Sequence, residues 1–204
     1  MDSETGYVII EKPLSVSFDQ IHEVLWAANE SNRNKGIILK TSELSGPELE
    51  ERIGRDGKCF VAMKEDRVIG TASMRVRDRD RWYYKGRIAE LILVAVIPEC
   101  QGKGLVTLLM DKVLDTARER GFSAIETDTA EKNARAIDIY KHRGFRPVDY
   151  RRFVGADHFS VVMVKWLNAC PYSETKRKWN YAYRRAVVRV KYRMKAALRH
   201  WSPK

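Results

Sequence analysis

The sequence lacks several features that would point to particular classes of protein. Its cysteines, Cys59, Cys100 and Cys170, are odd in number and form no Cys-x-x-Cys pair, so neither a zinc site nor a disulfide framework is indicated. There is no run of about 18 apolar residues that would cross a membrane as a helix. The first residues, MDSETG, are polar and acidic, unlike a secretory signal. We therefore expect a cytoplasmic protein in a reducing compartment, without a bound metal.

Acidic residues are absent from the C-terminal segment. All 27 Asp and Glu residues lie at or before Glu174, whereas eleven of the 38 Lys and Arg residues follow it. The chain up to Glu174 therefore has no net charge, and the whole excess of +11 belongs to what comes after. We divide the chain into a neutral domain, residues 1–170, and a basic segment, residues 171–204, because the two need separate explanations.

Apolar residues alternate between strand and helix periodicities through the neutral domain. Strands are predicted where short apolar runs end in turns, and helices where apolar positions recur every three or four residues between caps and glycines. Strands are expected at residues 7–11, 59–76 (two strands), 87–97, 122–130, 146–153 and 158–167, and helices at 17–29, 45–54, 105–120 and 133–143. The polar residues 29–35 are expected to form a loop. This order indicates an α/β domain with one mixed sheet.

A glycine turn stands between an apolar strand and a long helix in AVIPECQGKGLVTLLM, residues 95–110. The N-terminus of a helix presents free N–H groups and the positive end of the helix dipole, which suit a phosphate. Gly102 and Gly104 let the backbone approach an anion closely, and Lys103 adds positive charge. On its own the pattern fits a pyrophosphate site or an ordinary turn, because it matches neither the Rossmann nor the P-loop fingerprint.

A second motif, one strand later, favours the phosphate site. The pattern Asn-x-x-Ala-x-x-x-Tyr-x-x-x-Gly-Phe is met by Asn133, Ala136, Tyr140, Gly144 and Phe145. The pattern Val-x-Pro-x-x-[Arg/Gln]-x-x-Gly-x-[Gly/Ala] is met, except at its last position, by Val96, Pro98, Gln101, Gly104 and Val106. With both motifs, the sequence resembles the GNAT family of acetyl-CoA-dependent acyltransferases from about residue 7 to residue 167. The resemblance implies the GNAT fold, a single mixed, mostly antiparallel sheet with splayed central strands flanked by helices.

The resemblance also implies a binding site for acetyl-CoA. In this family the strand before the glycine turn leaves main-chain groups free, so the pantetheine arm is expected at Val94, Ala95 and Val96. The CoA pyrophosphate would be held by the backbone amides of Gln101, Gly102, Lys103, Gly104, Leu105, Val106 and Thr107, and the cofactor arm would be contacted by Asn133. Val106 stands where the family favours glycine or alanine, and its branched side chain narrows the approach of the phosphates.

Acyl transfer to an amine needs a base, a donor for the oxyanion and an acid. By the resemblance, Tyr140 would be the acid toward the CoA sulfur, and the Val96 amide is the candidate oxyanion donor. Glu90 has the spacing of the base in histone-acetyltransferase members, and desolvation on an apolar strand would raise its pKa. A water chain, Asp128 or Glu126 are the alternatives. The acceptor pocket is expected at Trp26 and at residues 29–35 and 82–84.

The basic segment carries one apolar stripe at helical spacing, formed by Trp179, Tyr183, Val187, Val190, Met194, Leu198 and Trp201. Three interpretations stay open. The helix packs on its own domain or on a second copy in a homodimer. Alternatively, as a basic amphipathic helix, it lies on an anionic membrane surface. In the third, it binds an acidic partner, for which an acyl-carrier protein is favoured over nucleic acid.

Both parts of the chain enter the functional prediction. We predict an N-acetyltransferase that moves an acetyl group from acetyl-CoA to a primary amine, on a small molecule or another amino-group acceptor, by direct attack in a ternary complex. One alternative is an acyltransferase that uses a longer acyl donor, on CoA or an acyl-carrier protein, at a membrane surface. The other is a non-catalytic scaffold that binds CoA, for which Val106 is the only support in the sequence.

Overall fold

A computed structural model describes residues 6–153, 156 and 158–200, with the backbone alone for residues 196–200. The elements run in the order β1 (Val8–Glu11), α1 (Phe18–Ala28), α2 (Glu30–Arg33), α3 (Gly46–Ile53), β2 (Lys58–Lys64), β3 (Arg67–Asp78), β4 (Arg87–Val96), α4 (Leu105–Glu119), β5 (Ala124–Ala130), α5 (Ala134–His142), β6 (Arg146–Arg151), β7 (Ser160–Trp166) and α6 (Glu174–His200). This order agrees with the prediction except at α2, a short helix within the segment predicted as a loop.

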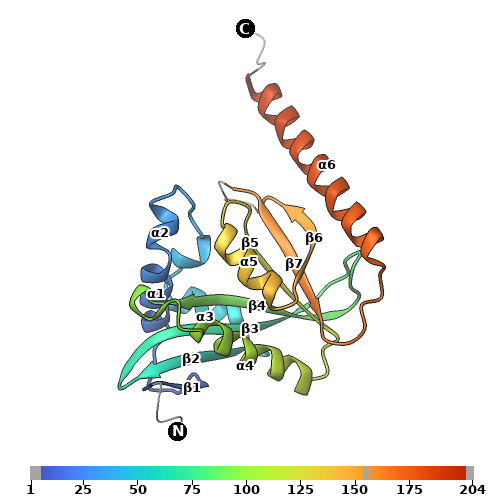
Figure 1. Ribbon diagram of the computed structural model, residues 1–204. Coiled ribbons are helices and arrows are strands. Elements are labelled where there is room, and N and C mark those ends of the chain that lie inside the picture. Colours follow the sequence, from blue (N-terminus) through green and yellow to red (C-terminus); the bar gives the residue numbers. More distant parts are fainter. Residues whose placement is uncertain (1–5, 154–155, 157, 201–204) are drawn as a thin grey trace.

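The seven strands of the described chain form one sheet in the order β1-β2-β3-β4-β5-β7-β6 (Figure 1). Neighbouring strands are antiparallel except β4 and β5, which run parallel. That parallel pair is held by only two residue pairs, Ala89 with Ile125 and Glu90 with Glu126. Beyond Glu90 the two strands separate, so the centre of the sheet is splayed. The predicted fold class is confirmed.

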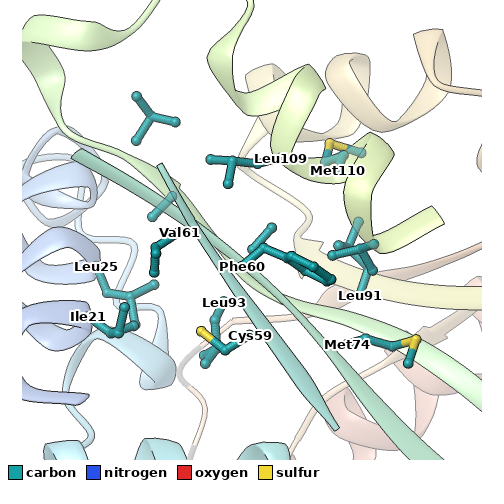
Figure 2. Packing of buried hydrophobic residues seen from close by; sticks show 14 of the residues in the cluster. Ile21, Leu25, Cys59, Phe60, Val61, Met74, Leu91, Leu93, Leu109 and Met110 are labelled. Atoms are coloured by element: carbon teal, nitrogen blue, oxygen red, sulfur yellow. The ribbon is translucent and has the colours of Figure 1, made fainter. Parts of the chain in front are cut away.

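Helices cover both faces of the sheet. Helix α4 packs on β2, β3 and β4, and helices α1 and α3 pack on β3, with α1 also on β4. In Figure 2, Ile21 and Leu25 of α1 lie on the side of Cys59, whereas Leu109 and Met110 of α4 lie on the side of Phe60. Cys59 and Phe60 are consecutive strand residues, which point to opposite faces. One hydrophobic core therefore fills both sides of the sheet.

The ends of the first helices are fixed by residues that the sequence already marks. Ser17 accepts a hydrogen bond from the backbone of Gln20, and the Gln20 side chain accepts one from the backbone of Ser17, which is a capping box. Ser45 and Glu48 form a second box at the start of α3. These caps satisfy N–H groups that a helix leaves unpaired, so α1 and α3 begin where predicted.

Strand β4 contains a bulge at the point where it leaves β5. Ser73 of β3 faces Ile92, but Thr71 faces Ala95, so β4 has one residue more than its partner between these pairs. Within it, Leu93 adopts a φ of +53°, although its side chain is buried. A non-glycine residue in this region is strained, and such strain is typical of functional sites. The bulge separates the paired half of β4 from the splayed half.

Helix α6 leaves the domain at its C-terminal half and is the longest element (Figure 1). Ser173 accepts a hydrogen bond from the backbone of Lys176 and so caps its start. Its first half packs against β6. Among the described helices, none combines the length and the apolar character that crossing a membrane requires. The boundary at residues 170 and 171 stays a prediction.

Candidate active site

A cavity of about 940 Å³ opens where β4 and β5 separate. One wall is the second half of β4 and the other is the end of β5 with the start of α5. The glycine turn before α4 closes one end, and the segment from α1 to residue 41 borders the other. Eleven of the thirteen residues predicted for the site line it: Glu90, Val94, Ala95, Val96, Gln101, Gly102, Gly104, Leu105, Val106, Asn133 and Tyr140. Lys103 and Thr107 lie outside the lining.

The main chain of Val94, Ala95 and Val96 borders the cavity because no strand pairs with this edge of β4. The bulge at Leu93 comes directly before these residues. Gln101 Nε2 donates to the carbonyl oxygen of Val96 at 2.9 Å and ties the glycine turn to the strand end. An extended ligand would therefore meet strand-like backbone on one side of the cavity.

The glycine turn has the geometry that an anion site requires. Gly102 and Gly104 have φ values of +79° and +77°, which glycine adopts without the strain of other residues. Within the described residues, the amides of residues 102–106 donate no hydrogen bond, whereas Gln101 donates to Pro98 at 3.2 Å and Thr107 to Gly104 at 2.9 Å. Five consecutive free amides at the start of α4 thus form the anion-binding part of the predicted stretch. The Gln101 and Thr107 amides are already engaged.

Asn133 has a structural role in addition to its place in the wall. Its Oδ1 accepts from the backbone N–H of Ala136 at 3.2 Å and caps α5. Arg135 Nη1 donates to Gln101 Oε1 at 3.0 Å, so the start of α5 is joined to the glycine turn. Val106, the departure from the family pattern, is half-buried and packs against the core while it also borders the cavity.

Tyr140 is buried at the base of the cavity and keeps its proton. Burial raises the pKa of its hydroxyl to about 12, although a hydrogen bond with Thr127 lowers it and the charge of Asp128 raises it. The Tyr140 ring lies 5.6 Å from that of Phe145, which holds its orientation. A phenol that stays protonated across the neutral range is suited to give a proton to a thiolate.

Glu90, the first candidate for the base, is held by arginines. Its Oε2 accepts from Arg75 Nε at 2.7 Å, and its Oε1 pairs with Arg79. Arg77 lies 3.8 Å from the same carboxylate. The side chain is 4% exposed, so these cations compensate a carboxylate removed from water. Both carboxylate oxygens of Glu90 are therefore engaged by arginines.

Glu126 and Asp128, the alternative candidates for the base, stand two residues apart on β5 and differ in their side-chain partners. Glu126 accepts from Arg79 Nη2 and from the Tyr83 hydroxyl, each at 2.6 Å. The Asp128 side chain makes no hydrogen bond within the described residues and is open to the cavity. Protein surrounds that cavity, so burial, followed by the charges of Glu126 and Glu90, raises the pKa of Asp128 to about 6.

Of the three groups of residues predicted for the acceptor pocket, one lines the cavity and two do not. Asn29, Asn32 and Lys35 are among the lining residues of the 29–35 segment. Trp26 is absent from the lining, and its ring instead stacks under Arg33. Residues 82–84 are absent as well, because Tyr83 is fully buried beneath the sheet.

Sequence reasoning missed the arginines of this end, Arg52, Arg75 and Arg79. Arg75 and Arg77 of β3 and Arg79, directly after it, stand two residues apart, and that spacing was the available signal for a basic strand face. No cluster of three or more His, Cys, Asp and Glu side chains that could hold a metal occurs in the described part of the chain.

Comparison with known proteins agrees with this geometry. Residues 18–145 match the family model described as acetyltransferase (GNAT) family. Mycothiol acetyltransferase of Beutenbergia cavernae is 27% identical over 139 residues, which are 55% of this chain and 46% of that protein, so the chain spans about half the length of this relative.

Solved structures show the same fold. The ribosomal-protein-S18-alanine N-acetyltransferase of Escherichia coli superposes with a TM-score of 0.61 at 17% identity, over 82% of this chain and 97% of that one. A GNAT acetyltransferase of Elizabethkingia anophelis with acetyl-CoA bound gives a TM-score of 0.57 at 15% identity, over 80% of this chain and 100% of that one. Because the family model covers more than half of its length, the chain belongs to the GNAT acetyltransferase family.

Proposed function

We propose that the chain transfers an acetyl group from acetyl-CoA to a primary amine by direct attack in a ternary complex. The observation that carries the proposal is one cavity that joins free amides at a helix start, unpaired strand backbone, a protonated phenol and an unpaired carboxylate. Each of these groups serves a different step of acyl transfer, and all border the same space.

Acetyl-CoA, the acetyl donor, would lie along the gap where β4 and β5 separate. The free amides of residues 102–106 would hold the pyrophosphate, and the main chain of Val94 to Val96 would bind the pantetheine arm. Asn133 would contact that arm through its side-chain Nδ2, since its Oδ1 is engaged in capping α5. The contacts from residues 94–96 and 102–106 are with main-chain groups, so they depend on the glycine turn and the β4 bulge rather than on particular side chains.

For the chemical step, we assign the base to Asp128 in place of Glu90. With a pKa of about 6, Asp128 is ionised at neutral pH and still basic enough to take a proton from an ammonium group, directly or through water. The amine then attacks the thioester carbon, and the Val96 amide would stabilise the oxyanion. The C–S bond breaks as the intermediate collapses, and the CoA thiolate takes the Tyr140 proton.

Calorimetric titration with acetyl-CoA, followed by thiol-release assays over a panel of amines, tests the proposal. We expect saturable binding of acetyl-CoA and turnover with at least one amine, faster than with longer acyl-CoA donors. Binding without turnover on any acceptor would indicate the scaffold alternative. Preference for a long acyl chain would indicate the alternative donor, and absence of binding would refute the cofactor site itself.

A further inference from the structure

Helix α6 is docked on the domain through one face. Tyr181 and Val188 pack against the core, and Arg177 is buried. The Tyr192 ring lies edge-on to that of Phe159 at 5.5 Å. With 100° between successive residues, these positions share one side of the helix.

Ion pairs fix the rotation of the helix about its axis. Arg185 Nη2 and Arg189 Nη2 donate to Glu131 Oε1 at 2.6 and 2.5 Å, and Arg184 lies 3.4 Å from Asp149. Burial raises the pKa of Glu131, but hydrogen bonds from Arg189, Tyr150 and Arg185 outweigh it and lower that pKa to about 2. Rotation of α6 would break all of these contacts together, so the outward face is fixed.

That outward face carries the apolar stripe from Trp179 to Met194; the Leu198 side chain and Trp201 lie outside the described part of the chain. Trp179 is 65% exposed and Met194 60%, and the positions between them in the stripe, Tyr183, Val187 and Val190, are exposed as well. The 15 steps from Trp179 to Met194 correspond to about 22 Å of helix. The rings of Trp179 and Tyr183 stack at 5.4 Å, and a shallow apolar groove follows along the stripe. The helix thus packs on its domain, as one alternative predicted, but through the face that carries Tyr181, Val188 and the paired arginines and not through the stripe.

Basic side chains border the stripe. Lys191 and Arg193 are exposed on its two flanks, and Lys195 is exposed nearby. None of the three forms an ion pair within the described residues, in contrast to Arg185 and Arg189 on the docked face. An apolar band with aromatic residues and unpaired cations beside it is typical of a helix that lies in a lipid headgroup region.

We propose that α6 binds the surface of a membrane that contains anionic lipids, with its axis parallel to the surface. A second copy of the chain is a poor occupant, since joining two stripes would bring two sets of unpaired cations together. Nucleic acid would leave the apolar stripe in water. An anionic lipid surface matches both features, and the stripe faces away from the domain, so docking requires no rearrangement.

Co-sedimentation of the full chain with vesicles tests this proposal. We expect binding to phosphatidylcholine vesicles that contain phosphatidylglycerol to be at least about tenfold stronger than to phosphatidylcholine alone. The double variant Val187→Ser and Val190→Ser should lower binding to the anionic vesicles by about tenfold or more, since two exposed valines then lose their burial in lipid. Ala182→Ser is the matched control, because Ala182 is exposed on α6 outside the stripe; it should change binding less than about twofold.

Three results would overturn the proposal. They are equal binding to both kinds of vesicle, wild-type binding by the double variant, and a dimer in analytical ultracentrifugation that the double variant abolishes. The last would assign the stripe to a second copy. Since Val187 and Val190 are exposed, the fold of the variant should be intact, and its thermal midpoint checks this.

A different observation concerns the acceptor end of the cavity. Arg52, in the last turn of α3, lines the cavity. Its guanidinium makes no hydrogen bond or ion pair within the described residues. Its Nε is buried without a partner. Burial and the charge of Arg75 lower its pKa, and the more distant charges of Asp128 and Glu90 only partly compensate. A partly buried guanidinium without an anion is costly, and a bound anion would remove that cost.

Arg52 and Asp128 provide opposite charges on the walls of one cavity. Each alters the pKa of the other, but they form no ion pair. A ligand with an amine beside a carboxylate would fill the gap, with the amine at Asp128 and the carboxylate at Arg52. We infer that the acceptor is an α-amino acid or a compound with that terminal group. This inference rests on the proposed function and specifies its substrate class.

Arg52→Gln, with Arg52→Lys as the conservative variant, tests this assignment. With amino acid acceptors, Arg52→Gln should raise KM by about tenfold or more while kcat changes little, and Arg52→Lys should restore part of the loss. With the corresponding amines that lack the carboxylate, the effect of both variants on KM should be much smaller.

Equal effects on both classes of acceptor would overturn the role of Arg52. Equal use of both classes by the wild type would overturn the acceptor class and leave acetyl transfer intact. Failure of acetyl transfer to every acceptor, with acetyl-CoA bound, would instead refute the proposed function.

Discussion

The carboxylate of Asp128 provides the sharpest test of the chemistry, through the variant Asp128→Asn. Asparagine has nearly the same shape but cannot accept the proton. Loss of a general base reduces rates by about 10²- to 10⁴-fold, so we expect kcat/KM near pH 8 to fall by at least about 100-fold. Binding of acetyl-CoA should stay within about twofold, because the donor contacts lie on β4 and the glycine turn.

The pH dependence follows from the raised pKa of Asp128. A carboxyl group with a pKa of about 6 is about 90% ionised at pH 7 and about 10% ionised at pH 5. The ratio of wild-type to Asp128→Asn rates should therefore fall about tenfold from pH 7 to pH 5. A base with an ordinary carboxyl pKa would lose less than about a tenth of its activity over this range. Taking the ratio removes the titration of the acceptor amine, which is common to both enzymes.

Stability should change in the opposite direction to activity. The folded state raises the pKa of Asp128 from 3.8 to about 6, so it favours the protonated form. The contribution of Asp128 to the free energy of unfolding is fully present below pH 3.8 and is lost as the pH rises through about 6. The full shift corresponds to about 3 kcal/mol, but water in the cavity screens the side chain, so we expect about 1 kcal/mol or less. Asp128→Asn should thus raise the thermal midpoint at pH 7 by roughly 2–4 °C at most.

Paired measurements of initial rate and thermal midpoint, at pH 5 and pH 7, check both statements on the same protein samples. The reasoning fails if Asp128→Asn retains more than about a third of the wild-type rate at pH 8, where a base contributes most. It also fails if the rate ratio is flat between pH 5 and pH 7, since Asp128 would then not be the titrating base. A lower thermal midpoint at pH 7 would show that its charge is not a cost to the fold.

Substitutions at three other positions separate acid catalysis, donor binding and helix docking. Tyr140→Phe should lower kcat by about 100-fold while the Kd for acetyl-CoA, measured by calorimetry, stays constant; an unchanged kcat would remove Tyr140 from the mechanism. Gly104→Val should weaken acetyl-CoA binding at least about tenfold, because φ is +77° there and a branched residue is strained by roughly 1–3 kcal/mol; wild-type affinity would contradict the role of the glycine turn. Glu131→Gln should destabilise the protein by about 1 kcal/mol at pH 7, where Arg185 and Arg189 lose their anion, and this difference should vanish in thermal scans as the pH falls to about 2.

Local signals in the sequence were sufficient for most of the fold. Capping residues such as Ser17 and Ser45 fix where helices begin, and the glycine turn requires a backbone that glycine adopts most readily. The exception, α2, is only one turn long and has no side-chain cap, so the polar segment gave no helical signal. The bulge at Leu93 had no signal either, because a leucine with positive φ arises from the two strands around it and not from its own preference.

The chemistry of the site was less accessible, because the state of a carboxylate depends on its neighbours across the sheet. In the sequence alone, Glu90 is an isolated acid on an apolar strand. Arg75, which faces it on β3, turns it into one member of an ion pair. Burial, followed by the charges of Glu126 and Glu90, raises the pKa of Asp128, and Arg79 pairs with those two glutamates and not with Asp128. The proposed exchange of Glu90 for Asp128 as the base thus rests on strand register, which composition and spacing do not fix.

Helix α6 illustrates the same dependence on the rest of the fold. Periodicity identified its apolar stripe, and burial of the apolar face is the usual outcome for a helix on a globular domain. Here Glu131 and Asp149 present anions where the helix docks, and they select its arginines instead. The apolar stripe therefore stays exposed to water, which is unfavourable in free energy for large apolar side chains. Acids on the domain that pair with the arginines of a basic helix therefore orient its apolar face outward. An outward apolar face with unpaired cations beside it is suited to an anionic lipid surface. The vesicle experiment measures that binding.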